Sequence, residues 1–200
     1  MKELWPGRVR AAFSDELGER AYVEEGFGPV TVDVPADSWH DAVLLARDGL
    51  GCTFFDWLSA VDELDDGFRL VCHLVHRRPG ATEHLLLRTL LPREAASASS
   101  VADVFRGARW HERETHEMFG VAFTEDGRPL ELAPLLLPEQ FEAHPLRKEF
   151  VLASRVVKPW PGAKEPGESG EGAPSRRRTR PPGVPEAEQW GPHPPGGGDG

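Results

Sequence analysis

This sequence has few cysteines, and the shortage limits what the chain can bind. Only two cysteines occur in 200 residues, Cys52 and Cys72, and no Cys-x-x-Cys motif is present. Because an iron–sulfur cluster normally takes four thiolate ligands, this chain cannot hold one by cysteine ligation alone. Two small buried core residues are the simplest interpretation of the pair, and a disulfide stays open.

Segments that insert into or cross a membrane are lacking as well. No stretch approaches the ~18 consecutive apolar residues that a transmembrane helix needs. The first residues, from Met1 to Pro6, carry no apolar signal core. We therefore expect a soluble, cytoplasmic chain whose membrane association comes only through partners.

Motifs for nucleotide binding are also absent. The chain has neither a Gly-x-Gly-x-x-Gly fingerprint nor a Gly-Lys-Ser/Thr loop, and it has no nucleophile elbow. The segment Gly-Phe-Gly-Pro at 26–29 fails as a phosphate loop, because a proline and then a strand follow where a helix should begin. We expect no bound cofactor, no NADH binding and no catalytic residue in this chain.

Charge and composition divide the chain into two parts. Residues 155–200 are rich in proline and glycine and hold seven basic and six acidic side chains, whereas the whole chain has a net charge of −10. The remainder is therefore strongly acidic, which argues against a nucleic-acid partner. We expect one domain at residues 1–152 and an extended, disordered tail at 153–200. The basic run at 176–180 is either a solvated linker or a contact for an acidic partner or anionic lipid.

Apolar periodicity predicts an α+β fold. Spacings of three and four predict helices, and alternation or short apolar runs predict strands. The expected elements are a helix at 8–17, a strand at 30–34, a helix at 39–50, strands at 53–61, 68–76 and 83–91, a surface connection at 92–100, a helical turn at 101–105 and a helix at 110–119. This order favours a mostly antiparallel sheet with helices packed on one face.

Two blocks between residues 110 and 150 combine charge with large apolar side chains. The first holds Glu112, Arg113, Glu114, Glu117, Met118, Phe119 and Gly120, and the second holds His144, Pro145, Leu146, Arg147 and Lys148. Four charges within six positions need partners, because an unpaired half-buried charge is costly. Ion pairs with loops of the same domain and with a neighbouring subunit both satisfy that need, and we favour the subunit interface.

The second block follows the last regular element. Pro145 keeps its segment extended, so we expect Arg147 and Lys148 to reach outward and dock on a partner's acidic surface without contributing to the fold. An anion site beside His144 is the weaker alternative, because neither a glycine-rich loop nor a helix N-terminus accompanies it.

The combination of His111, Glu112 and His116 invites comparison with a zinc-protease motif. That motif needs two histidines four residues apart on one helical face. Here they are five apart, and at ~100° per residue their side chains lie about 140° apart. We therefore expect no metal site. A stand-alone hydrolase using Glu112 and His116 stays as the rival from another functional class, and stoichiometric zinc in the purified chain would favour it.

Together the two blocks resemble the hallmarks of one family. Glu-Arg-Glu, two residues, Glu and Met-Phe-Gly at 112–120, followed by His-Pro-Leu-Arg-Lys at 144–148, are similar to the 30 kDa subunit of respiratory NADH:quinone oxidoreductase, which is the C-type subunit in bacteria. The similarity extends more loosely over residues 8–152. The loop at 124–138 departs from the family, since Gly-Arg-Pro at 127–129 replaces the usual Gly-His-Pro and Ala-Pro at 133–134 replaces a frequent Arg-Arg pair.

The resemblance implies an accessory, non-catalytic subunit of a membrane-associated, proton-translocating NADH:quinone oxidoreductase. It implies docking onto the 49 kDa, D-type subunit of the quinone module, beside iron–sulfur subunits and peripherally at the cytoplasmic face of the cell membrane. Iron–sulfur clusters, flavin and quinone are expected in those partners. The alternative is the equivalent subunit of a related membrane-bound hydrogenase or a ferredoxin- or F420-linked oxidoreductase.

Overall fold

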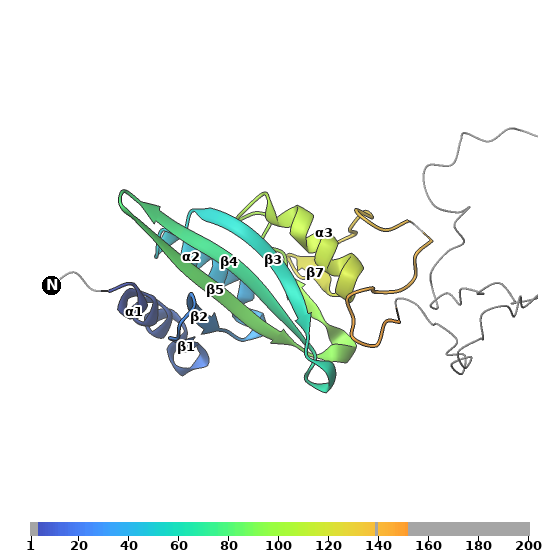
Figure 1. The fold of residues 1–200 in the computed structure, drawn as a ribbon, viewed down its shortest axis with the longest axis horizontal. Coiled ribbons are helices and arrows are strands. Elements are labelled where there is room, and N and C mark those ends of the chain that lie inside the picture. Colours follow the sequence, from blue (N-terminus) through green and yellow to red (C-terminus); the bar gives the residue numbers. More distant parts are fainter. Residues whose placement is uncertain (1–3, 139, 152–200) are drawn as a thin grey trace, which may run out of the picture.

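The chain is built around one five-stranded sheet (Figure 1). The computed structural model describes residues 4–138 and 140–151. The strands are β1 (Tyr22–Glu24), β2 (Val30–Asp33), β3 (Phe54–Asp62), β4 (Phe68–Arg78) and β5 (Ala81–Leu91), in the spatial order β1-β2-β5-β4-β3. Neighbours pair antiparallel except β2 and β5, which are parallel. The predicted α+β fold with a mostly antiparallel sheet is confirmed.

One face of this sheet forms the core. The register places Val32, Leu87, Cys72 and Leu58 in one row across four strands, and each of these side chains is at most 1% exposed. Burying such a row removes apolar surface from water, which is the main driving force of folding. Both cysteines are buried and free, as expected for core residues.

Three helices contribute side chains to the same core. They are α1 (Trp5–Leu17), α2 (Trp39–Asp48) and α3 (Ala108–Phe119), and short 3-10 turns lie at Gly18–Arg20, Ala36–Ser38, Leu64–Asp66 and Arg93–Ala95. Helix α1 begins earlier than the predicted 8–17 because Pro6 occupies its first turn, where its missing N–H has no intrahelical partner to lose. The predicted turn at 101–105 is confirmed by a hydrogen bond from the N–H of Phe105 to the carbonyl of Val101 (2.9 Å).

A second, small sheet has no counterpart among the predicted elements. It consists of β6 (Ser97–Ser99), β7 (Ala122–Glu125) and β8 (Arg128–Pro129). The prediction of a surface connection over 92–100 is wrong at its C-terminal end, since β6 pairs in parallel with β7. These short strands lack an alternating series of large apolar residues such as Val30 and Val32 in β2 with Val34 just after it, and β1 is not predicted for the same reason.

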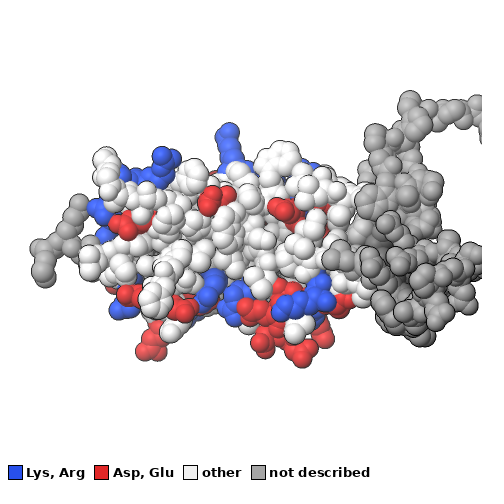
Figure 2. Space-filling model, in the orientation of Figure 1, with Lys and Arg blue, Asp and Glu red and all other residues white. Residues whose placement is uncertain are grey.

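Among the described residues, no helix covers the other face of the large sheet. Figure 1 looks onto this face, with α2 behind the strands. Val61 on β3 and Leu90 on β5 both lie beside Arg69 of β4 and are 49% and 41% exposed. Figure 2 shows the same view, in which the middle of the face is largely uncharged.

Two predictions touch the boundaries of the described residues. Within residues 4–138 and 140–151, no helix combines the length and apolar character needed to cross a membrane. The tail predicted at 153–200 and its basic run at 176–180 lie outside the described residues.

Candidate functional site

Helix α3 carries the first charged block and presents two opposite faces. Its buried residues are Ala108, Glu112, Thr115 and Phe119. At ~100° per residue these four side chains fall on one side of the helix, and Trp110, Arg113, Glu114 and Glu117 fall on the other. The helix ends at Gly120, whose φ of 77° permits a left-handed cap with an N–H bond to the carbonyl of His116 (2.8 Å).

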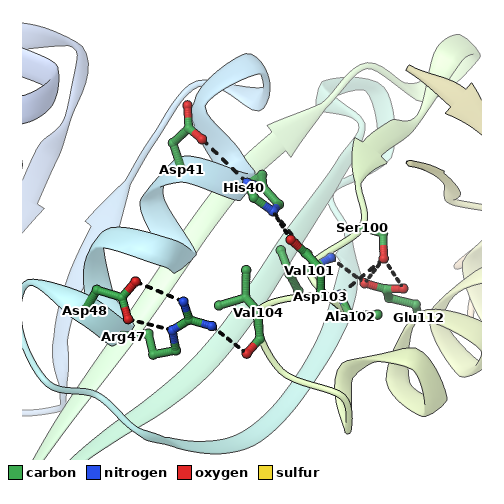
Figure 3. A network of polar contacts seen from close by, with 10 residues as sticks. All are labelled: His40, Asp41, Arg47, Asp48, Ser100, Val101, Ala102, Asp103, Val104 and Glu112. Carbon is green, nitrogen blue, oxygen red and sulfur yellow. Dashed lines mark hydrogen bonds and ion pairs between the residues drawn. The ribbon is translucent and has the colours of Figure 1, made fainter. Parts of the chain in front are cut away.

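Glu112 ties the inner face of α3 to the segment after β6. Its carboxylate is fully buried and accepts hydrogen bonds from the Ser100 hydroxyl (2.8 Å) and the Val101 N–H (2.8 Å), as Figure 3 shows. Burial raises the pKa of Glu112, although these donors act in the opposite direction. The prediction that Glu112 forms an ion pair is wrong, because neutral donors satisfy it. Because Glu112 has no exposed surface, it cannot contact a partner subunit directly. It can stabilise an interface only by holding the backbone of its own domain in place.

The same segment is held from the other side by α2. His40 contacts the carboxylate of Asp103 through Nε2 (2.9 Å), and Arg47 donates to the carbonyl of Val104 (3.1 Å) (Figure 3). Burial opposes protonation of His40, but the carboxylates of Asp103 and Asp41 outweigh it and raise the pKa of the imidazole. Residues 100–104 are therefore fixed between two helices.

Arg113 and Glu117, one turn apart on the outer face, hold the loop that follows β8. Arg113 donates from Nε to the carbonyl of Ala133 (2.7 Å) and from Nη2 to that of Pro134 (2.5 Å). Glu117 accepts N–H bonds from Leu135 (2.6 Å), Leu136 (2.9 Å) and, more weakly, Leu137 (3.4 Å). Both charges are thus engaged by backbone groups of their own domain, which favours the internal alternative for these two residues.

The second block closes the C-terminal end of α3. The last four carbonyls of a helix have no intrahelical donor. Here the carbonyl of His116 accepts the N–H of Gly120. The next three carbonyls accept hydrogen bonds from the second block: that of Glu117 from His144 Nδ1 (2.8 Å), that of Met118 from the Leu146 N–H (3.1 Å) and that of Phe119 from Arg147 Nε (2.7 Å). Burial lowers the pKa of His144, which favours a neutral ring that donates through Nδ1. The two blocks therefore form one structural unit.

The Arg147 side chain is half-buried and turns towards the end of α3. Its guanidinium stacks over Phe68 at 5.2 Å from the ring centroid, and a Cβ added at Gly120 would lie 2.2 Å from its Nη2. The positive charge also sits at the negative end of the α3 dipole. The prediction that the Arg147 side chain reaches outward is wrong, because the unsatisfied carbonyl of Phe119 and the Phe68 ring draw it inward.

Lys148 differs from its neighbour. Its side chain is exposed, while its N–H donates to Asp62 at the end of β3 (2.8 Å). Arg93 donates to the same carboxylate (2.7 Å) and pairs with Glu149. Burial opposes ionisation of Asp62, but Arg93 and the N–H groups of Lys148 and Leu64 outweigh it and lower its pKa to about 2. The hydrogen bond from Lys148 to Asp62 thereby fastens the second block to the end of β3.

The residues considered for a hydrolase point in different directions. His111 Nδ1 lies 3.2 Å from the carbonyl of Leu58, whereas His116 Nδ1 lies 2.9 Å from that of Val121. Glu112 between them is buried against Ser100. Within the described part of the chain, no group of three metal-binding side chains is found.

Three residues of this unit have no signal in the sequence. Ser100, Asp62 and Arg93 lie far from both blocks along the chain and belong to ordinary loop or strand ends. Of the other predicted site residues, Glu114 is exposed, Met118 and Pro145 are half-buried, Leu146 is 54% exposed and Phe119 is buried. The two blocks thus combine a buried support with a partly exposed outer surface.

The arrangement of both blocks around one helix end can be compared with known proteins. A family model described as respiratory-chain NADH dehydrogenase, 30 kDa subunit, matches residues 32–156 and so includes both blocks. The chain belongs to this family. The resemblance predicted from the spacing of the two blocks is confirmed.

Named relatives agree with the family. The C-type subunit of NADH-quinone oxidoreductase from Chlorobium phaeobacteroides is 33% identical over 162 residues, which cover 79% of this chain and 91% of that protein. Its counterpart in a Roseiflexus species is 34% identical over 154 residues, covering 75% and 84%. The match with the counterpart in Methylobacterium radiotolerans is 35% identical and spans 65% of this chain but only 60% of that protein.

Two solved structures share the fold. The chain resembles one in the structure of the membrane-bound sulfane sulfur reductase, an archaeal respiratory membrane complex, with a TM-score of 0.57 and 25% identity over 72% of this chain and 84% of that one. It also resembles the trypsin-resistant fragment (1–134) of Nqo5, with a TM-score of 0.51 and 22% identity over 62% and 99%. The second similarity supports the fold alone.

Proposed function

We propose that this chain is an accessory, non-catalytic subunit of a membrane-associated, proton-translocating NADH:quinone oxidoreductase. The observation that carries the proposal is the internal use of the family hallmarks. Glu112, Arg113, Glu117, His144 and Arg147 are all engaged by hydrogen bonds within the domain. They leave no free nucleophile or acid–base pair among themselves, and they build a rigid support for the surface around them.

The partner that we propose is the D-type, 49 kDa subunit. A relative in Gluconacetobacter diazotrophicus, 37% identical over 112 residues, is named as the C/D subunit of NADH-quinone oxidoreductase, and the match covers 18% of it. A single chain named for both subunits supports a C-type domain that works beside a D-type domain. Glu114 and Lys148, charges of the two blocks on the outer surface, are proposed to contact this partner.

The redox groups are proposed to reside in other subunits. Iron–sulfur clusters, flavin and quinone would be bound by the D-type subunit and its iron–sulfur neighbours. This chain has only two cysteines, both buried, whereas a cluster normally needs four thiolate ligands. The chain would then lie peripherally at the cytoplasmic face of the cell membrane, held there through the complex.

A second assembly is supported by one observation. The similarity to a chain of the membrane-bound sulfane sulfur reductase favours a related respiratory membrane complex as the alternative. The donor of electrons separates the two: a flavin-containing NADH-oxidising subunit belongs to the first assembly and is not expected in the second.

Affinity purification from membranes tests the proposal. The full chain, tagged and expressed in its own host, is expected to co-purify with a D-type subunit and with NADH:quinone reductase activity. A tagged chain that is recovered alone from the soluble fraction would overturn it. Recovery with a D-type-like subunit but without a flavin-containing NADH-oxidising subunit would replace it by the second assembly.

A further inference from the structure

Three large apolar side chains are exposed around the outer face of α3. Trp110 is 58% exposed, Leu136 59% and Leu146 54%. Single exposed apolar residues are ordinary on protein surfaces. These three are unusual because Trp110 sits on α3 itself, and Leu136 and Leu146 sit on two separate segments that are both hydrogen-bonded to this helix.

Direct contacts connect the three positions. Arg113 stacks over the Trp110 ring at 5.0 Å and donates to the carbonyl of Pro134, two residues before Leu136. Glu117 accepts the Leu136 N–H (2.9 Å). The next residue of the helix, Met118, accepts the Leu146 N–H (3.1 Å). The backbone under each apolar side chain is thus held in place, so little conformational freedom is left to lose when a partner covers them.

The charges on this surface are arranged unevenly. The guanidinium groups of Arg113 and Arg147 turn inward to carbonyl oxygens, and the exposed side chain of Lys148 is followed by the exposed acid Glu149. Glu114 lies on the outer side of the helix, and the adjoining loops add two further acids, Glu131 and Glu142. The apolar side chains therefore stand within a surface whose outward-facing charges are mainly acidic.

We propose that Trp110, Leu136 and Leu146 form an anchor that inserts into an apolar recess of a partner subunit, and that the rim of this recess is basic. This inference rests on the proposed function, in which the partner is the D-type subunit. Charge complementarity favours a partner with a basic rim over a second copy of this chain. A second copy would place its own acidic rim against that of the first, and like charges repel. Large aromatic and apolar residues at the centre of an interface carry most of its binding energy.

Competitive assembly tests the anchor. Wild-type full chain and a variant with a different tag are co-expressed with the complex, and the ratio of the two tags in the purified membrane complex is measured. We expect the triple variant Trp110→Ser, Leu136→Ser, Leu146→Ser to be disfavoured at least about 30-fold, as for the loss of one interfacial hot spot. Leu136→Ser alone, which removes one exposed side chain, should be disfavoured about 5-fold or more. Glu114→Gln should weaken assembly less and reduce its dependence on salt.

A matched control removes comparably exposed apolar side chains elsewhere. Val61→Ser and Leu90→Ser lie on the uncovered face of the large sheet, and we expect this double variant to compete within about 3-fold of wild type. Equal incorporation of the triple variant and wild type would overturn the anchor. A wild-type chain that fails to assemble with the D-type subunit would instead overturn the proposed function.

The two other occupants give different results. Because truncation after Val151 also removes Trp160 and Trp190, the contribution of Trp110 is taken as the difference from Trp110→Phe in both the full and the truncated chain. If truncation shifts this contribution towards that of a more solvated indole, the chain's own tail covers the surface and the anchor is refuted. If the wild-type chain alone forms a dimer that the triple variant abolishes, a second copy is the occupant and the anchor is refuted. Unchanged fluorescence and a monomer in both cases support a partner subunit.

Discussion

Replacing Arg147 by methionine should destabilise the chain, although the residue lies beyond the last helix and strand of the described residues. The substitution keeps much of the apolar stem but removes the donor to the carbonyl of Phe119 and the cation over Phe68. A hydrogen bond from a charged donor contributes about 1.5–3 kcal/mol, and a cation–π contact about 0.5–1 kcal/mol. Because the Arg147 side chain is 29% exposed, we expect the low end, about 2 kcal/mol in total.

Thermal and urea unfolding of the full chain, followed by circular dichroism, measure this loss. For a folded domain of this size, about 2 kcal/mol corresponds to a decrease in Tm of roughly 4–8 °C. Lys148→Met is the matched control, since only its backbone N–H is used in the contacts described, and it should change stability by less than about 0.5 kcal/mol. Equal melting of the two variants would refute the role of Arg147 in closing helix α3.

Three further predictions follow from the same contacts. Gly120→Ala should destabilise more than Gly127→Ala in urea melts: both glycines have positive φ (77° and 73°), with a backbone cost of about 1–2 kcal/mol, but only at Gly120 would a Cβ lie 2.2 Å from Arg147. Asp62→Asn should lower the free energy of unfolding by about 2 kcal/mol at pH 7, because a pKa lowered from 3.8 to about 2 stabilises the fold above pH 3.8 and this contribution is lost as pH falls towards 2. The difference in stability between wild type and variant should therefore narrow below about pH 4, and a difference that stays constant with pH would contradict this. His40→Gln should destabilise most near pH 6 and least near pH 9, because a pKa raised from 6.5 stabilises the fold below pH 6.5 and this contribution is lost as pH rises through the folded-state pKa; a pH-independent difference in Tm would contradict it.

The large elements of the fold are predictable because their residues repeat with the period of a helix or a strand. The two long strands of the hairpin follow the expected ranges within two residues, since β4 ends at Arg78 and β5 begins at Ala81 around the Pro-Gly turn. The small sheet is not predictable in this way. Ser97–Ser99 carries only small residues, and its pairing with β7 is fixed by tertiary contacts.

The candidate site is predictable in its residues but not in its contacts. The charges of the two blocks indicate that partners are needed, and charged or polar side chains are the natural candidates. The structure supplies backbone carbonyls and N–H groups instead, such as those of Ala133 and Leu135. A backbone donor or acceptor has no residue type, so no sequence pattern marks it. Only the capping requirement of a helix end indicates that a following segment must return to satisfy it.

Site-specific photo-crosslinking tests the docking of this chain most directly. A photoreactive amino acid is placed at Leu136 or, for comparison, at Leu90 in the full chain, and the assembled membrane complex is irradiated. The two positions are 59% and 41% exposed and lie on different surfaces. We predict an adduct with the D-type subunit from position 136 and none with it from position 90. An adduct with the D-type subunit from position 90, and none from position 136, would contradict docking through the outer face of α3.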